Sequence, residues 1–180
     1  MVDAGRRSTV PELMEEIVRY KSYMRFSGGG ITLSGGDPLL QHEFAAELFA
    51  ACRKEGIHTA LDTSGYAPLE VARPVLDQCD LVLLDIKSIA PETFRRVTGV
   101  PIDNTLQIAE YPAARHIPTW VRFVQVPGLT DDEDEIRALA AYLARLQVET
   151  AEVIAFHHMG EYKWTELDIA YTLADLPPAH

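Results

Sequence analysis

The chain has 180 residues, of which 47% are hydrophobic and 24% are charged, the proportions of an ordinary globular domain. Its formal net charge of −11 argues against a nucleic-acid or anionic-membrane surface, because such surfaces need clustered lysine and arginine. No run approaches about eighteen uninterrupted apolar residues, and the N-terminus lacks the apolar core of a signal peptide. The two cysteines, Cys52 and Cys79, fall in different predicted elements, so we expect no disulfide framework and a cytoplasmic location.

The first predicted element is a helix over residues 11–26, preceded by a polar loop at residues 1–7. Thr9 and Glu12 have the spacing of a capping box. Behind them apolar residues recur at helical intervals, at Val10, Leu13, Met14, Ile17 and Val18. A strand is predicted at 30–34 and a second helix at 40–55, whose predicted inner face carries Leu40, Phe44, Leu48, Phe49 and Cys52.

The alternation of strands and helices continues along the chain. Strands are predicted at 58–62, 81–86, 119–126 and 152–156, and helices at 68–76, 91–97, 103–115 and 131–146. Short apolar strands that alternate with helices favour βαβ units and a parallel sheet in an α/β fold. The pattern fits an open doubly wound sheet or part of a (β/α) barrel, in a single domain over residues 1–180.

Each predicted strand carries polar or flexible groups near its carboxyl end or is followed by them. They are Ser34-Gly35-Gly36-Asp37, Asp62-Thr63-Ser64-Gly65, Asp85-Ile86-Lys87, Arg122 and His157-His158. The carboxyl ends of parallel strands gather at one edge of the sheet, where α/β enzymes bind their ligands. Adjacent glycines also let a ligand approach the backbone closely. We therefore expect a ligand site at this edge.

Several of these residues also have a purely structural interpretation. Asp37 is suited to cap a helix, and Asp62 to form an Asx turn. Asp85 and Lys87 lie two residues apart on one side of a strand, so a structural ion pair is equally expected. Arg122 lies between apolar neighbours, where a charge is costly unless it is paired or functional. The two adjacent histidines point in opposite directions, so at most one of them faces the site.

The chemistry of these groups suits a small anionic or zwitterionic ligand. Lys87, Arg122 and His157 would bind a carboxylate or a phosphate, whereas Asp62 and Asp85 would hold a cation or an ammonium group. Two other hypotheses remain open at this point. One is a barrel lyase or hydrolase in which Asp62, Asp85 and His157 ligate a divalent metal and Lys87 is the base. The other is a non-catalytic binding module.

Five segments, in order and at similar spacing, resemble the radical S-adenosylmethionine (SAM) enzymes, and most closely the glycyl-radical enzyme activases of the pyruvate formate-lyase type. They are residues 27–41, 54–65, 80–87, 120–128 and 157–164. The resemblance implies a partial (β/α) barrel. It also implies a radical SAM oxidoreductase, in which a [4Fe-4S] cluster cleaves SAM and the resulting radical takes a hydrogen atom from a glycine of the partner. The implied partners are pyruvate formate-lyase or another glycyl-radical enzyme and a flavodoxin-type reductant, with no nucleic acid and no membrane.

The same resemblance implies roles for the first two strand ends. Gly35 and Gly36 would bind the methionine amino group of SAM through their backbone, with Asp37 in place of the usual glutamate. Asp62 and Thr63 would lie near the methionine carboxylate. Asp62 would also help to hold a monovalent cation.

The other strand ends complete the implied cofactor site. Asp85 would share both roles of Asp62, at the carboxylate and at the cation. Lys87, Arg122 and His157 would contact the carboxylate and the ribose of SAM. Ile86, between Asp85 and Lys87, is counted with the cofactor-binding residues. The resemblance identifies no catalytic residue within the chain.

The sequence departs from the family pattern in its cysteines. The family holds its cluster with a CxxxCxxC loop, and Cys52 and Cys79 cannot substitute for it at their spacing. We therefore expect an incomplete radical SAM-like domain that lacks the family's first strand and C-terminal end. We also expect that this chain does not hold the cluster.

Overall fold

The computed structural model describes residues 6–179 and contains a five-stranded sheet in the order β1-β2-β3-β4-β5. Its strands are β1 (Gly30–Leu33), β2 (His58–Thr63), β3 (Leu81–Asp85), β4 (Thr119–Gln125) and β5 (Thr150–Ala155). Each strand pairs in parallel with the next one along the chain. The predicted α/β class and parallel sheet are confirmed. The sequential order is that of a partial (β/α) barrel, because a doubly wound sheet reverses its strand order.

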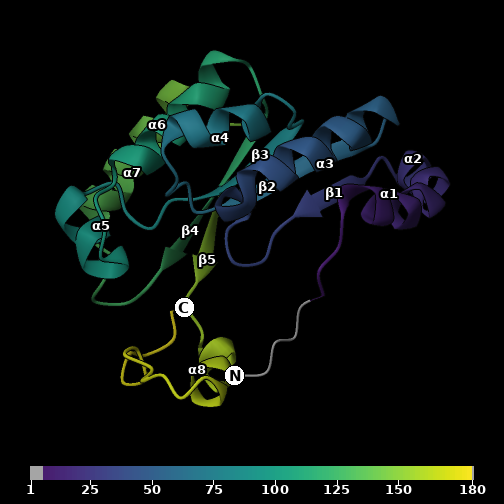
Figure 1. Cartoon of the computed structure of the whole chain (residues 1–180). Coiled ribbons are helices and arrows are strands. Elements are labelled where there is room, and N and C mark those ends of the chain that lie inside the picture. Colours follow the sequence, from purple (N-terminus) through teal and green to yellow (C-terminus); the bar gives the residue numbers. More distant parts are fainter. Residues whose placement is uncertain (1–5, 180) are drawn as a thin grey trace.

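The connecting helices lie together on one side of the sheet (Figure 1). They are α3 (His42–Lys54), α4 (Leu69–Leu76), α5 (Pro91–Thr98), α6 (Asp103–Ala114) and α7 (Glu133–Leu146). A short 3-10 turn, η2 (His158–Gly160), and helix α8 (Glu161–Glu166) follow β5 and lie beyond the carboxyl end of that strand (Figure 1). The helices therefore cover one face of the sheet and leave the other for side chains of a site.

The first predicted helix is two helices, α1 (Val10–Arg19) and α2 (Lys21–Ser27). The capping box forms as predicted, with the Thr9 amide donating to the Glu12 carboxylate at 2.7 Å. The helix ends at Tyr20, whose amide donates to the Ile17 carbonyl at 3.0 Å and so tightens the last turn. The expectation of one continuous helix is wrong. Of the predicted loop at residues 1–7, only residues 6 and 7 are within the described range.

The second predicted helix begins as a separate 3-10 turn, η1 (Pro38–Gln41), before α3. Three residues per turn, instead of 3.6, shift which side chains face inward. Leu39 is therefore buried at 2% exposure, whereas Leu40, predicted on the inner face, is 77% exposed. The other residues predicted on the inner face are confirmed: Leu48, Phe49 and Cys52 are buried and Phe44 is half-buried.

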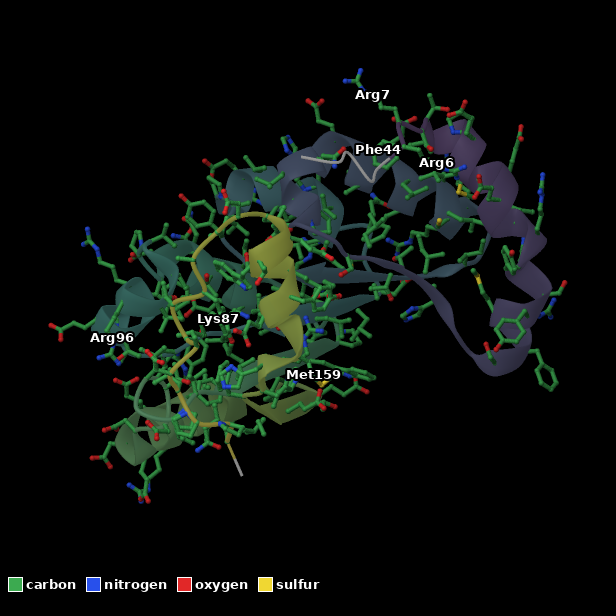
Figure 2. The ribbon with its side chains drawn as sticks, turned by 90° about the horizontal axis from the view of Figure 1, so that it is seen from below. Arg6, Arg7, Phe44, Lys87, Arg96 and Met159 are labelled. Atoms are coloured by element: carbon green, nitrogen blue, oxygen red, sulfur yellow. The ribbon has the colours of Figure 1, made fainter. Side chains whose placement is uncertain are left out.

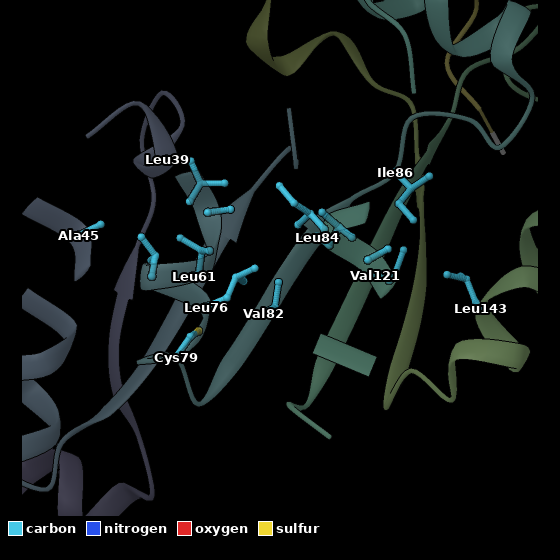
Figure 3. Packing of buried hydrophobic residues seen from close by; sticks show 14 of the residues in the cluster. Leu39, Ala45, Leu61, Leu76, Cys79, Val82, Leu84, Ile86, Val121 and Leu143 are labelled. Atoms are coloured by element: carbon cyan, nitrogen blue, oxygen red, sulfur yellow. The ribbon is translucent and has the colours of Figure 1, made fainter. Parts of the chain in front are cut away.

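The main hydrophobic core lies between the sheet and its helices (Figure 3). Leu61, Val82, Leu84 and Val121 are buried on the strands and pack with helix residues such as Leu76. Side chains alternate between the two faces of a strand, so the neighbours of these core residues point to the opposite face. A smaller core, formed by Val10, Leu48, Cys52 and Ile57, lies under α1.

Among residues 6–179, no helix combines the length and the apolar character needed to cross a membrane.

Candidate functional site at the carboxyl ends of the strands

Three charged side chains from neighbouring strands meet on the face of the sheet that the helices leave open. Asp62, Asp85 and Arg122 come from β2, β3 and β4, each next to a buried core residue in its strand. Arg122 Nε donates to Asp85 Oδ1 at 2.8 Å, and Arg122 Nη2 donates to Asp62 Oδ1. The three side chains are only 21–28% exposed. The arginine therefore bridges two carboxylates across three strands.

The electrostatics of this bridge favour its charged form. Burial by itself would lower the pKa of the Arg122 guanidinium, but the carboxylates of Asp85 and Asp62 together raise it above its ordinary value. The mid-strand charge that the sequence predicted to be paired or functional is thus paired. Asp62 forms no Asx turn with its own loop but accepts from Arg122 and from Ser34.

Lys87 adds a second cation to the same edge. Its Nζ donates to Asp85 Oδ2 at 2.9 Å, so both oxygens of that carboxylate are paired and the predicted ion pair is confirmed. A cavity of about 310 Å³ opens beside it, lined by Ser64, Tyr66, Lys87, Phe94, Thr98, Val100 and Thr105. In the view from below, Lys87 lies toward the middle of the molecule and Arg96 of α5 toward its edge (Figure 2).

The glycine loop after β1 borders this charged cluster. Ser34 Oγ donates to Asp62 Oδ2 at 3.0 Å, which ties the start of the loop to the cluster. Gly35 has φ +120, a backbone conformation that side chains disfavour. A Cβ at either Gly35 or Gly36 would meet no atom within 4 Å, so the space beside both residues is open. Their backbone groups are thus accessible to a ligand.

Asp37 is surrounded by donors from this chain. Oδ1 accepts from the Leu39 amide at 3.1 Å, and Oδ2 accepts from the amide and the hydroxyl of Ser64 at 3.0 and 2.7 Å. The Thr63 hydroxyl lies within 2.9 and 3.0 Å of the two oxygens. The structural interpretation of Asp37 as a helix cap is confirmed at η1. Thr63 is buried and its hydroxyl is directed at Asp37.

Two of the predicted site residues lie apart from the cluster. The side chain of Ile86 is fully buried in the main core, because alternation of side chains turns it away from Asp85. Its place among the cofactor-binding residues stays a prediction. His157 is exposed after β5, and its Nδ1 accepts from the Met159 amide at 3.3 Å. His158 Nε2 lies 2.8 Å from the Leu176 carbonyl oxygen. Within the described range, neither histidine has a hydrogen bond or an ion pair to the charged cluster.

The structure adds residues to this edge that the sequence analysis missed. Glu135 at the start of α7 accepts from the hydroxyls of Ser88 and Thr93 at 2.9 and 2.6 Å. Ser88 is buried and directly follows Lys87, so this contact fixes the loop that carries the lysine. In the sequence, Glu135 belongs to an acidic run at residues 131–135, which by itself indicates only the N-terminus of a helix. A contact with a loop more than forty residues away has no sequence signal.

The cysteines do not fit an iron–sulfur cluster. Burial raises the pKa of the Cys52 thiol to about 11 and that of Cys79 to about 12, and the two residues belong to different hydrophobic cores. Cluster ligation requires several thiolates at one place. The predicted place of Cys52 on the inner face of its helix is confirmed, and Cys79 is buried as well.

A divalent-metal site is not formed by these residues either. Among residues 6–179, no three His, Cys, Asp or Glu side chains come together as metal ligands. Arg122 lies between the carboxylates of Asp62 and Asp85. The hypothesis of a metal-dependent lyase or hydrolase is therefore not favoured.

The sheet order is that of a partial (β/α) barrel, and comparison with known families gives the class of protein. The radical SAM superfamily profile matches residues 2–140. The Streptococcus suis SuiB structure bound to S-adenosylmethionine shares the fold, with a TM-score of 0.67 at 16% identity over 84% of this chain and 35% of that one. The chain is a radical SAM superfamily protein.

Relatives of higher identity show the family within this superfamily. The pyruvate formate-lyase 1-activating enzyme of Escherichia coli K12 is 40% identical over 179 residues, covering 97% of this chain and 72% of the relative. The pyruvate formate-lyase-activating enzyme of Staphylococcus aureus USA300 is 39% identical at the same coverage. A solved domain of the Bacteroides vulgatus activating enzyme has a TM-score of 0.65 at 32% identity, covering 72% of this chain and 81% of that one. The chain belongs to the pyruvate formate-lyase-activating enzyme family.

Proposed function

We propose that this chain binds SAM at the strand-end cluster and serves the activation of a glycyl-radical enzyme of the pyruvate formate-lyase type. The observation that carries the proposal is the Arg122 bridge between Asp62 and Asp85, beside the open backbone of Gly35 and Gly36. Family membership supplies the reaction class, since the relatives are named for activating pyruvate formate-lyase.

The charges of the cluster suit the methionine end of SAM. Its ammonium group would bind backbone carbonyl groups of Gly35 and Gly36 and lie near the carboxylate of Asp62. Its carboxylate would bind Arg122 and Lys87, the two cations of the cluster. A monovalent cation at Asp62 and Asp85 stays part of the proposal. Binding would then exchange ion pairs within the chain for ion pairs to the ligand.

The family also implies a protein partner and an electron donor. The partner would be a protein with the glycine to be activated, and a flavodoxin-type protein would be the electron donor. His157, exposed after β5, would contact the ribose. The cysteines of this chain do not fit the cluster, so the roles proposed for its residues are to bind and orient SAM.

Calorimetric titration of the whole chain with SAM tests the proposal. We expect stoichiometric binding, weakened about tenfold or more by Arg122→Lys, because lysine cannot form the two-sided contacts of the guanidinium. Adenosine, which lacks the methionine end, should bind without sensitivity to this substitution.

The matched control is Arg137→Lys. Arg137 also makes two ion pairs, to Glu133 and Asp134, but lies exposed on α7. We expect its SAM affinity to equal that of the unmodified chain. Absence of SAM binding to the unmodified chain, or equal losses in both variants, would contradict the proposed site.

A further inference from the structure

Asp37 has the position of a ligand-binding acid but the contacts of a structural one. It directly follows Gly35-Gly36 at the carboxyl end of β1. Its two oxygens have hydrogen bonds from the Leu39 amide, the Thr63 hydroxyl and both the amide and the hydroxyl of Ser64. A carboxylate has about four lone-pair sites. The four donors of the chain already occupy the lone-pair sites of Asp37.

The contacts of Asp37 join two loops that are far apart in the sequence. Thr63 ends β2 and Ser64 follows it, and the Thr63 hydroxyl in turn accepts from the Gly65 amide at 3.0 Å. Ser64 is linked onward to α6, because its carbonyl oxygen accepts from the Thr105 hydroxyl at 3.3 Å. Asp37 therefore fixes the end of the glycine loop to the Thr63-Ser64 segment. That segment is itself held by its hydrogen bonds to the Gly65 amide and the Thr105 hydroxyl.

Ser34 fixes the other end of the same loop, through its hydrogen bond to Asp62. The two residues between these anchors are Gly35 and Gly36, which have open space beside them. A glycine pair is flexible by itself, and holding it in one conformation in advance lowers the entropy lost when a ligand binds. The hydrogen bonds of Ser34 and Asp37 thus restrict the conformations that the two glycines can adopt.

We propose that Asp37 is a positioning residue, which holds the Gly35-Gly36 backbone for the ligand through Thr63 and Ser64 and makes no contact with the ligand itself. The role at SAM rests on the proposed function. The link between the two loops does not, and it is tested without ligand.

Amide hydrogen exchange of the ligand-free chain tests the link. Asp37→Ala should accelerate exchange of the Leu39, Ser64 and Gly65 amides about tenfold or more, since their hydrogen-bond network is lost. Exchange in β5, which has no contact with this network, is the internal control. Unchanged exchange at Ser64 would overturn the proposal, whether or not SAM binds.

A double-mutant cycle with Ser64→Ala tests whether Asp37 acts through Ser64. If Asp37 acts through Ser64, the two substitutions share one effect: about tenfold weaker SAM binding for Asp37→Ala, about threefold for Ser64→Ala, and about tenfold for both. A loss in the double variant that equals the product of the single losses would overturn positioning.

Asp37→Asn is the conservative variant and keeps the test valid if Asp37→Ala does not fold. An asparagine can still accept from the Leu39 amide and the Thr63 hydroxyl but carries no charge. A positioning role predicts SAM affinity between those of the unmodified chain and Asp37→Ala. A direct ion pair with the ligand ammonium predicts equal losses for both variants. Failure of the unmodified chain to bind SAM would count against the proposed function, and the exchange measurement would still decide the link.

Discussion

Arg122 lies directly opposite Asp85 in the register of β4 and β3, and its Nε donates to Asp85 Oδ1 at 2.8 Å. Residues paired in this way point to the same face of a sheet. The contact is therefore a consequence of strand pairing, and the charged cluster is assembled by the same hydrogen bonds that hold the sheet together.

Replacing Arg122 by methionine should destabilise the chain. The change keeps an apolar stem but leaves the carboxylates of Asp62 and Asp85 close together without their shared cation. We expect a loss of about 1–3 kcal/mol in the free energy of unfolding, measured by urea denaturation. Arg137→Met is the control and should change it by less than about 0.5 kcal/mol, because its ion pairs are exposed. Equal effects of both variants would contradict a stabilising bridge.

Replacing Gly65 by alanine should also be costly, by about 1–3 kcal/mol. Gly65 has φ +70, and a Cβ there would lie 3.0 Å from Leu84 Cδ1 and 3.3 Å from Thr105 Cα. Strained backbone and overpacking therefore act together. Gly160→Ala is the control, since a Cβ at Gly160 meets nothing within 4 Å and its φ is −92. Thermal unfolding measures both, and a Gly65→Ala melting temperature as high as that of the control would contradict the packing described.

The burial of Leu39 in place of Leu40 can be tested by substituting each residue in turn. Leu39→Ala should lower the free energy of unfolding by about 2–5 kcal/mol, as expected for a leucine removed from a core. Leu40→Ala, at an exposed position, should change it by no more than about 0.5 kcal/mol. The reverse order would mean that this segment is an α-helix in the register predicted from the sequence.

The two thiols should be unreactive in the folded chain. Burial holds the pKa of Cys52 at about 11 and that of Cys79 at about 12, so neither is a thiolate near pH 8. We expect no rapid labelling by a thiol reagent in buffer and labelling of both residues in denaturant. Fast labelling of either thiol in buffer would contradict its burial.

The same thiols predict the direction of a pH effect. Cys79 loses its proton near its ordinary pKa of 9.0 in the unfolded chain, but only near pH 12 in the folded chain. Above pH 9 the unfolded state binds fewer protons, so stability falls as the pH rises from 9 to 12. Cys79→Ala should reduce this pH dependence in urea titrations. If stability depends on pH as strongly in Cys79→Ala as in the unmodified chain, other groups cause the dependence.

Reconstitution with iron and sulfide under anaerobic conditions should give no [4Fe-4S] cluster on this chain. Neither buried thiol is available, and the two lie in different cores. Absorbance and electron paramagnetic resonance measure the outcome. A SAM-responsive [4Fe-4S] signal on this chain would show that its cysteines can hold a cluster.

The sequence predicted most of the fold because its signals are local. Strand and helix periodicity placed the five strands within a few residues, and the capping box at Thr9 and Glu12 is present. The errors occur where local geometry changes the period. Tyr20 ends α1 with a tight turn, and the 3-10 turn at Pro38–Gln41 buries Leu39 in place of Leu40. A 3.6-residue period cannot anticipate a turn with three residues.

By itself, the sequence determined which residues stand at the strand ends, that the strands are parallel, and that only two cysteines are available. Alternation and spacing are sufficient for these conclusions. The tertiary structure decided which strand-end groups meet: Arg122 bridges Asp62 and Asp85, Asp37 joins Thr63 and Ser64, and Ile86 turns into the core. Such contacts depend on strand order and register, which bring residues sixty positions apart within hydrogen-bond distance. A local sequence pattern cannot predict a contact between residues so far apart in the chain.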